Sequence, residues 1–450
     1  MYEPCGMPLS KYAKFPFNPA KWPFFYGWVV IVVGTLGILM SIPGQTIGVS
    51  TFTDSLIDVL SINRDQISLA YMIGTVLSSF LLTSAGKLYD THGVRLVAGI
   101  GSFALGLSLI VLSQIDVIIS ALGIIGDVVP IVMVMIVGFS FIRFFGQGVL
   151  TLVSRTMMMQ WFDARRGFAT SFSNVFIALG FSAAPFYIEM LIQGYSWNGA
   201  WLIMGVIASC IFPLVVIVFF RNSPYDVGLL PDGGKVAKKV KKLLFPVKKE
   251  FSVSEVRKSL IFWVYALFMS MQALYITGFT FHVVSIFDTV GMSRSTAIDI
   301  FQLMAVTSVI TSLLFGWVSD YIKLNILFYC KGAASILALL GLVFLGNYDI
   351  AYYMLVIGSG VMTGLYGVVT AVTWPRLFGK LHLGAISGFC MTIIVFGSAL
   401  GPMLFSLSKS QTGDYVLAAW ITLGMFVGLT VLTAFVENPQ IKLNQEQANA

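Results

Sequence analysis

Residues 86–95 read GKLYDTHGVR and residues 316–323 read GWVSDYIK, and each stretch follows a long apolar run. Both stretches place an aspartate four positions after a glycine. A second pattern also recurs with identical spacing, as Gly167, Gly180 and Pro185 in the first half and as Gly384, Gly397 and Pro402 in the second. Two recurring patterns in the same order indicate that both halves of the chain share one plan.

The composition places this repeated plan in a membrane. Of the 450 residues, 57% are hydrophobic and only 10% are charged, with a mean hydropathy of +0.89. Because a soluble domain carries roughly 25% charged residues, most of this surface is expected to face lipid. Twelve apolar runs are long enough to cross a bilayer. They lie near 24–51, 66–86, 96–115, 129–157, 168–192, 198–220, 259–284, 296–318, 325–346, 351–375, 384–408 and 415–436. We therefore predict an all-α membrane protein with transmembrane helices in two pseudo-symmetric six-helix bundles.

The basic residues predict how the chain is oriented. If the N-terminus is cytoplasmic, 22 of the 27 lysines and arginines fall in cytoplasmic segments and three fall outside. The remaining two, Arg143 and Lys331, fall within predicted spans. The positive-inside rule then predicts a multi-pass protein of the cell membrane with both termini cytoplasmic. The predicted domains are an N-tail at 1–23, a six-helix bundle at 24–220, a basic connector at 221–258, a second six-helix bundle at 259–436 and a C-tail at 437–450.

The connector carries its own pattern. Lysines alternate with apolar residues at helical spacing over 235–244. This pattern predicts an amphipathic helix that lies on the anionic inner leaflet, with membrane lipid as its partner. The alternatives for this segment are a solvated linker and a partner-binding segment. Further on, Ser252 and Glu255 have the spacing of a capping box ahead of the seventh span.

Several other classes of protein lack support in the sequence. The four cysteines are scattered and the three histidines lie far apart, so we expect no disulfide framework, no metal site and no cofactor. Neither HExxH nor GxSxG occurs within the spans, so an enzyme is not expected. Because topology explains the net charge of +7, nucleic acid is not an expected partner.

The two six-span halves, the basic connector and the GxxxDxxGxR loop together resemble the major facilitator superfamily of secondary transporters. The resemblance covers essentially the whole chain. It implies two bundles that rock about a midplane site and open it to each side in turn. It also implies a conformational latch, in which the loop aspartate sits against the positive N-terminal end of a helix from the other half. The residues that match this latch are Gly86, Asp90, Gly93 and Arg95, Gly316 and Asp320 in the second copy, and Arg165 and Arg166 before span five.

Four shorter segments resemble the monocarboxylate transporter and oxalate/formate antiporter branch. They are FYGW at 25–28, PGQTIGV at 43–49, RFFGQG at 143–148 and RRG at 165–167. This resemblance implies proton-coupled transport of a small organic anion. The chain departs from the branch where the branch carries charge, since Gln45 stands near the lysine of span one, and Ser308 and Ser312 stand at the aspartate and arginine positions of span eight. A larger, amphipathic or weakly charged metabolite therefore stays open as the substrate, and a transporter-fold solute sensor stays open as the function.

Ionisable residues within spans are costly and are candidate functional groups. Arg143, at midplane depth, is predicted to anchor an anion or couple its transport, or else to tie neighbouring helices together. His282 and Glu189 are further coupling candidates. The alternatives are packing for His282 and a solvated or lipid-interface carboxylate for Glu189. Lys331 is interpreted as a side chain that snorkels to the inner surface, with a functional role as the alternative.

The predicted substrate cavity is polar, aromatic and mainly uncharged. Its candidate residues are Gln45, Thr46, Arg143, Gln147, Asn174, Gln272, Tyr275, Thr277, His282, Tyr366, Thr370 and Trp374. The expected partners are a small-molecule substrate and protons, and the expected state is a monomer.

Overall fold

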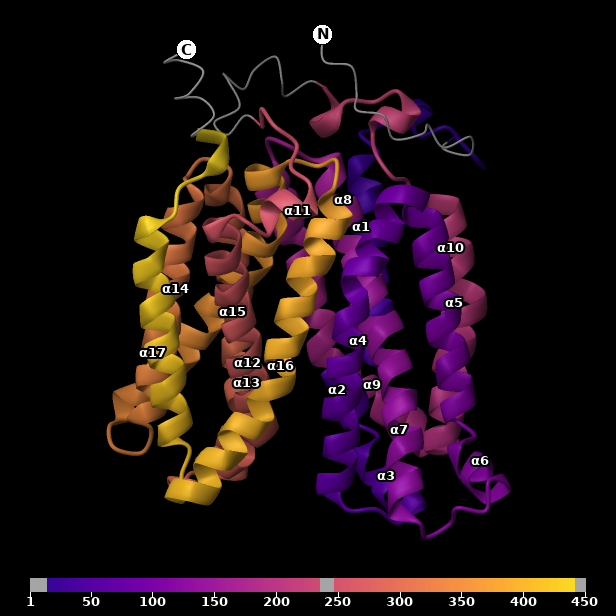
Figure 1. Ribbon diagram of the computed structural model, residues 1–450, viewed down its shortest axis with the longest axis vertical. Coiled ribbons are helices and arrows are strands. Elements are labelled where there is room, and N and C mark those ends of the chain that lie inside the picture. The colour runs from indigo at the N-terminus through magenta and orange to yellow at the C-terminus, as the bar shows by residue number, and fades with distance from the viewer. Residues whose placement is uncertain (1–13, 235–246, 442–450) are drawn as a thin grey trace. The chain divides into compact units, whose positions relative to one another are not determined.

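The computed structural model describes residues 14–234 and 247–441, and every regular element in these ranges is helical (Figure 1). The all-α class is therefore confirmed. The longer helices are α1 (Gly27–Met40), α4 (Arg64–His92), α5 (Val94–Leu112), α7 (Val128–Ile142), α8 (Thr151–Trp161), α9 (Arg166–Val206), α12 (Leu260–Thr289), α13 (Arg294–Ser319), α14 (Leu324–Val343), α15 (Asp349–Phe378), α16 (Leu383–Thr412) and α17 (Val416–Leu432). Shorter helices are α2 (Thr46–Ser50), α3 (Thr53–Leu60), α6 (Ile115–Ala121), α10 (Phe212–Phe219) and α11 (Val253–Val256).

Ten helical stretches in the described ranges are long and apolar enough to cross a membrane. The first predicted run is divided, because α1 ends before a 3-10 turn at Ile42–Gly44 and only the short α2 follows. The fifth and sixth runs lie in one stretch, Arg166–Phe219, which consists of two helices joined across a kink between the two predicted runs. Within it, Ser196 leaves helical geometry with φ 65° and ψ 171°. Each of the other predicted runs overlaps one continuous stretch.

The described residues form two compact units. Unit 1 holds residues 14–162, 176–234 and 387–392. Unit 2 holds residues 163–175, 247–386 and 393–441. Helices α9 and α16 therefore each contribute to both units. These units are defined by contacts within the fold, whereas the predicted domains are defined by membrane topology. The predicted domain boundaries therefore stay a prediction.

Glycines set the closest helix crossing in unit 1. A Cβ on Gly44 would lie 2.2 Å from the carbonyl oxygen of Ile142 and 2.9 Å from the Cα atom of Gly146. Only glycine allows backbones to approach this closely. The crossing therefore holds the break between α1 and α2 directly against the end of α7.

In unit 2, α14 packs against both α15 and α17, which lie beside it in Figure 1. Small residues again allow this contact, since a Cβ on Gly341 would lie 2.4 Å from the backbone nitrogen of Leu355. A Cβ on Gly358 would likewise lie 2.4 Å from the backbone nitrogen of Ala338. Helices α14 and α15 therefore touch where Ala338 and Gly341 of α14 meet Leu355 and Gly358 of α15.

The predicted capping box before span seven is confirmed. Glu255 accepts a hydrogen bond from the backbone N–H of Ser252 at 2.8 Å, and α11 begins one residue later. The predicted amphipathic helix of the connector lies largely outside the described residues, which exclude 235–246.

Candidate functional site

Arg143 begins η3 (Arg143–Leu150), a wide π-type segment between α7 and α8, and its side chain is 1% exposed. Its Nε donates to Thr75 Oγ1 at 3.1 Å and its Nη1 donates to the carbonyl oxygen of Gly44 at 3.0 Å. The guanidinium carbon lies 5.0 Å from the ring centre of Tyr71. Among the described residues no carboxylate pairs with Arg143, and its Nη2 has no hydrogen-bond partner. A buried cation held only by neutral acceptors still favours a nearby negative charge.

Two of the predicted residues join Arg143 through a polar network in unit 1. Tyr71 donates its hydroxyl to Thr46 Oγ1 at 2.9 Å. Gln45 Nε2 donates to Ser41 Oγ at 2.9 Å and to Thr151 Oγ1 at 3.2 Å. The structure therefore brings Gln45, Thr46 and Arg143 together around the break between α1 and α2.

Gln147 carries an unused acceptor in the same π-type segment as Arg143. It follows Arg143 by four residues within η3, and its Oε1 is buried without a hydrogen-bond partner. Segments of π-helix are rare and are frequent at functional sites. Within η3, Arg143 thus keeps an unused donor and Gln147 an unused acceptor.

In unit 2, two predicted residues tie α12 to α15. Gln272 Nε2 donates to the carbonyl oxygen of Met362 at 3.3 Å. One turn further along α12, the hydroxyl of Tyr275 lies 3.2 Å from that of Ser359. The amide oxygen of Gln272 is buried and has no hydrogen-bond partner. The contact between the helices therefore satisfies the amide nitrogen of this side chain but not its oxygen.

Two other predicted residues tie α12 to α16. The hydroxyl of Thr277 lies 3.2 Å from that of Ser398. His282 Nε2 lies 3.0 Å from the carbonyl oxygen of Pro402. Because a carbonyl only accepts, Nε2 carries the proton in this contact. The bond supports the packing alternative for His282, and its role in coupling stays a prediction.

The remaining unit 2 candidates lie along α15. A Cβ on Gly367 would lie 2.5 Å from Asn174 Nδ2, so this amide lies directly on α15. Thr370 bonds the carbonyl oxygen of Tyr366 in its own helix. Trp374 is 1% exposed and stacks against neighbouring aromatic rings. Their contact with substrate stays a prediction.

Lys331 differs from its sequence interpretation. Its side chain is 0% exposed and its Nζ has no hydrogen-bond partner. The Nζ atom lies 5.3 Å from the ring centre of Tyr366 and 5.9 Å from that of Phe268. The snorkelling interpretation is wrong, because α12 and α15 cover this face of α14. The sequence placed Lys331 within an apolar run but carried no signal for which face would be covered.

Glu189 is exposed on α9 and accepts a hydrogen bond from Gln193 at 3.1 Å. This supports the solvated or interfacial alternative. Its role in coupling stays a prediction.

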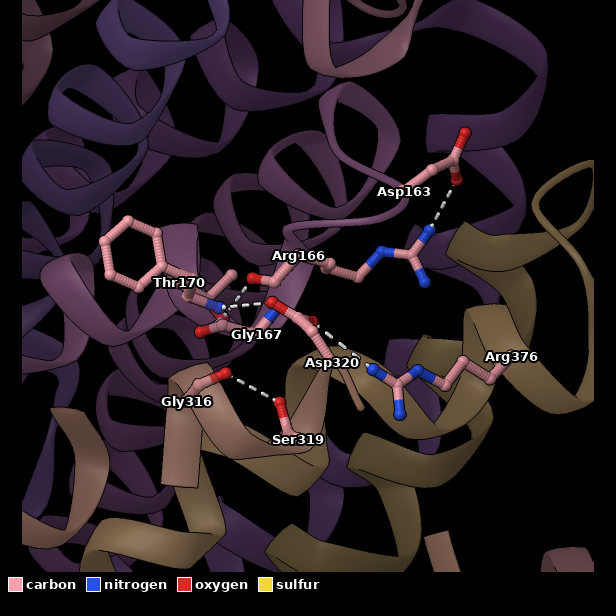
Figure 2. Close-up of polar contacts among 9 residues, drawn as sticks. Asp163, Arg166, Gly167, Thr170, Gly316, Ser319, Asp320 and Arg376 are labelled. Atoms are coloured by element: carbon pink, nitrogen blue, oxygen red, sulfur yellow. Dashed lines mark hydrogen bonds and ion pairs between the residues drawn. The ribbon is translucent and has the colours of Figure 1, made fainter. Parts of the chain in front are cut away.

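The second copy of the repeated loop forms a helix-end contact (Figure 2). Asp320, directly after α13, accepts hydrogen bonds from the backbone N–H groups of Gly167 at 2.9 Å and Phe168 at 3.2 Å. These N–H groups belong to the positive first turn of α9. A Cβ on Gly167 would lie 2.5 Å from the carbonyl oxygen of Gly316, so the two glycines allow the approach. Asp320 therefore has the geometry that the latch requires.

Arg376, Asp163 and Lys380, which no sequence pattern marked, lie near this contact together with the predicted Arg166. Arg376 Nη2 lies 3.4 Å from Asp320, with both side chains buried. Asp163 pairs with Lys380 at 2.8 Å and with Arg166 at 3.0 Å. Burial raises the pKa of Asp163, but the charges of Lys380 and Arg166 outweigh burial and lower it below the ordinary value. Arg165 is exposed.

The first copy of the loop makes contacts within unit 1. Gly93 has φ +82° at the end of α4, a conformation that favours glycine. Asn222 Oδ1 accepts from the backbone N–H of Val94 at 2.7 Å, and Arg95 Nε donates to the carbonyl oxygen of Phe220 at 2.9 Å. This copy therefore fixes the segment that follows α10. The other two residues in this copy, Gly86 and Asp90, lie in the last two turns of α4.

Comparisons with known proteins support one family. The profile of the Major Facilitator Superfamily matches residues 30–402. No curated protein sequence matches the chain. The xylose symporter XylE, a proton:xylose symporter solved with 6-bromo-6-deoxy-D-glucose, is similar with a TM-score of 0.62 and 16% identity, over 90% of this chain and 94% of that one.

Two further structures are similar in fold. The E. coli fucose:proton symporter FucP has a TM-score of 0.60 and 14% identity, over 91% of this chain and 98% of that one. The human organic anion transporter MFSD10 has a TM-score of 0.60 and 13% identity, over 90% of this chain and 98% of that one. Because the family profile spans most of a chain whose helices match those of membrane transporters, the protein is a transporter and not an enzyme, and it belongs to the major facilitator superfamily.

Proposed function

We propose that the chain is a secondary active transporter that moves a small organic anion across the cell membrane by alternating access. In this proposal protons are the coupling ion, both termini are cytoplasmic, and Arg143 anchors the anion. The orientation rests on the basic residues, of which 22 in 27 fall on the proposed cytoplasmic side.

The observation that carries the proposal is the environment of Arg143. Its guanidinium is buried, has no acidic partner among the described residues and keeps one nitrogen without an acceptor. Leaving a charge buried without a counter-charge is costly. A substrate carboxylate would supply that charge, and Gln147 Oε1 would accept a donor on the same substrate.

The contact of Asp320 with the first turn of α9 supports the conformational part of the proposal. A carboxylate at a helix N-terminus is stabilised by the helix dipole and by direct N–H bonds. We propose that breaking and forming this contact changes the balance between transport states. The pairs Asp320–Arg376 and Asp163–Lys380 would break at the same step.

A second candidate substrate is an amphipathic or weakly charged metabolite. The observation that favours it is the neutral character of the remaining candidates, since Gln45, Thr46, Gln272 and Tyr275 offer only uncharged hydrogen bonds. Such a ligand would be held by hydrogen bonds and stacking.

Flux into proteoliposomes tests the proposal. We expect uptake of labelled small carboxylates that depends on an imposed pH gradient. Arg143→Gln should abolish this uptake, and Arg143→Lys should retain part of it, because lysine keeps the charge but not the planar donor geometry.

Carboxylate flux that is equal in wild type and Arg143→Gln would contradict the anchor. Wild-type vesicles without any carboxylate-dependent flux would contradict the anion substrate and favour the second candidate. Arg257→Gln is the control, because this arginine is exposed and its neutralisation should leave uptake close to that of wild type.

A further inference from the structure

Unit 2 contains a buried cation that the proposed function does not use. Lys331 lies on α14 with an exposure of 0%, and among the described residues it has neither a carboxylate nor a hydrogen-bond acceptor at its Nζ. Moving an ammonium out of water costs several kcal/mol unless an opposite charge compensates. The aromatic faces of Tyr366 and Phe268, at 5.3 and 5.9 Å, return only part of that cost.

A second unused polar atom lies in the same interface. Gln272 is 3% exposed and follows Phe268 by one turn of α12. Its Nε2 bonds the carbonyl oxygen of Met362, which precedes Tyr366 by one turn of α15. Its Oε1 has no partner. Gln272 therefore lies one helical turn from Phe268 on α12, and the carbonyl that it bonds lies one turn before Tyr366 on α15, so both unused atoms belong to the interface of these two rings.

Neighbouring contacts show which elements the ammonium of Lys331 faces. Lys331 lies two turns before Ala338, the α14 residue in contact with Gly358, and Tyr366 lies two turns after Gly358 on α15. On the other side of α14, a Cβ on Gly332 would lie 2.3 Å from Thr430 Oγ1, so α17 closes that side. The ammonium is thus directed at α12 and α15.

We infer that Lys331 and Gln272 form an anion-binding site within unit 2 that takes a small organic anion carrying a hydrogen-bond donor next to its charged group. The ammonium holds the anionic group. The amide oxygen of Gln272 accepts the adjacent hydroxyl or amide hydrogen, and the rings of Phe268 and Tyr366 contact the carbon skeleton. This site goes beyond the proposed function, because it does not depend on Arg143.

Three probes of nearly equal size separate charge from hydrogen bonding. Glycolate carries a carboxylate and a hydroxyl, acetate lacks the hydroxyl, and glycolamide lacks the charge. Binding is measured by calorimetry on the purified full-length protein at constant ionic strength. To exclude the other buried cation, each titration is repeated in an Arg143→Gln background.

In that background we expect glycolate to bind more tightly than acetate, and glycolamide not to bind. Lys331→Met should weaken glycolate binding by tenfold or more, because a charge-assisted contact is lost. Lys331→Arg should retain part of the binding. Gln272→Met should reduce glycolate binding to the level of acetate. Lys323→Met, at the exposed start of the same helix, is the matched control and should bind as its parent does.

Thermal unfolding without ligand gives a second readout that does not depend on binding. Because Lys331→Met removes an uncompensated buried charge and conserves volume, we expect this variant to be more stable than wild type. Equal glycolate binding in the Arg143→Gln protein with and without Lys331→Met overturns the site, as does absence of glycolate binding in that background. If glycolate binds through Lys331 but wild-type vesicles show no carboxylate flux, the proposed function fails and the site stands.

Discussion

Asp320 combines a buried carboxylate with two backbone hydrogen bonds. Burial raises the pKa of Asp320 to about 6, although the N–H groups of Gly167 and Phe168 and the charge of Arg376 oppose the shift. The carboxyl group therefore takes up a proton close to neutral pH. At the scale of one residue, the helix-end contact is sensitive to pH.

This property predicts how stability depends on pH. The pKa of Asp320 in the folded protein lies above its ordinary value, so the folded protein binds this proton more tightly than the unfolded chain does. The resulting stabilisation is present at low pH and is lost as pH rises through about 6. Relative to Asp320→Asn, we expect wild type to gain about 1 kcal/mol between pH 7 and pH 5.

Thermal unfolding of both proteins in detergent at the two pH values measures this gain. Using the difference between the two proteins cancels the titration of all other groups. A difference that is the same at pH 5 and pH 7 contradicts the shifted pKa.

Sequence could predict single residues only where a pattern marked them. The repeated glycine-to-aspartate spacing marked Asp320 correctly. Arg376 and Lys380 were missed because 56 or more residues separate them from Asp320 along the chain, and no local pattern connects them. Lys331 was misinterpreted because an apolar run does not reveal which of its faces neighbouring helices cover.

At the level of the helices, the packing of α9 against α13 requires a glycine at position 167. A Cβ on Gly167 would lie 1.9 Å from Ser319 Oγ and 2.5 Å from the carbonyl oxygen of Gly316. We expect Gly167→Ala to push the first turn of α9 away from α13, lengthen the hydrogen bonds to Asp320 and destabilise the protein by about 1–3 kcal/mol.

Gly194→Ala in the same helix is the matched control, because a Cβ there would meet nothing within 4 Å. Alanine favours helix more than glycine does, so this control should be neutral or slightly stabilising in thermal unfolding. If the two substitutions have equal effects, the close contact is not what Gly167 provides. In a Gly167→Ala background, Asp320→Asn should also change the pH dependence of unfolding stability less than it does in wild type, because the two residues share one contact.

Elements were predicted well where hydropathy alone defines them. Each predicted run overlaps helix because twelve stretches of this apolarity have no other way to satisfy their backbones in lipid. The break at Ser196 falls in the gap predicted between the fifth and sixth runs, but its backbone geometry was not predictable, since neither proline nor glycine stands at that position. The π-type segment at Arg143–Leu150 likewise has no signal in composition.

For the whole molecule, orientation is the property most open to direct test. In a protein whose native cysteines have been replaced, we expect Gln411→Cys to react with an impermeant maleimide in intact cells. Lys323→Cys should react only after permeabilisation, because the positive-inside rule places it in the cytoplasm. Both positions are exposed, so access to the side chain does not limit labelling. The reverse pattern contradicts the proposed orientation.

The wide turn that begins at Arg143 affects how the protein can move. A π-type turn holds one residue more than an α-helical turn needs. If this surplus residue passes along the chain by one position, the side chains that it crosses rotate by about a quarter turn while both ends of the helix stay in place. Arg143 and Gln147 lie inside this segment. The fourth span can therefore redirect its cation by local rewinding, a smaller motion than rocking a whole bundle.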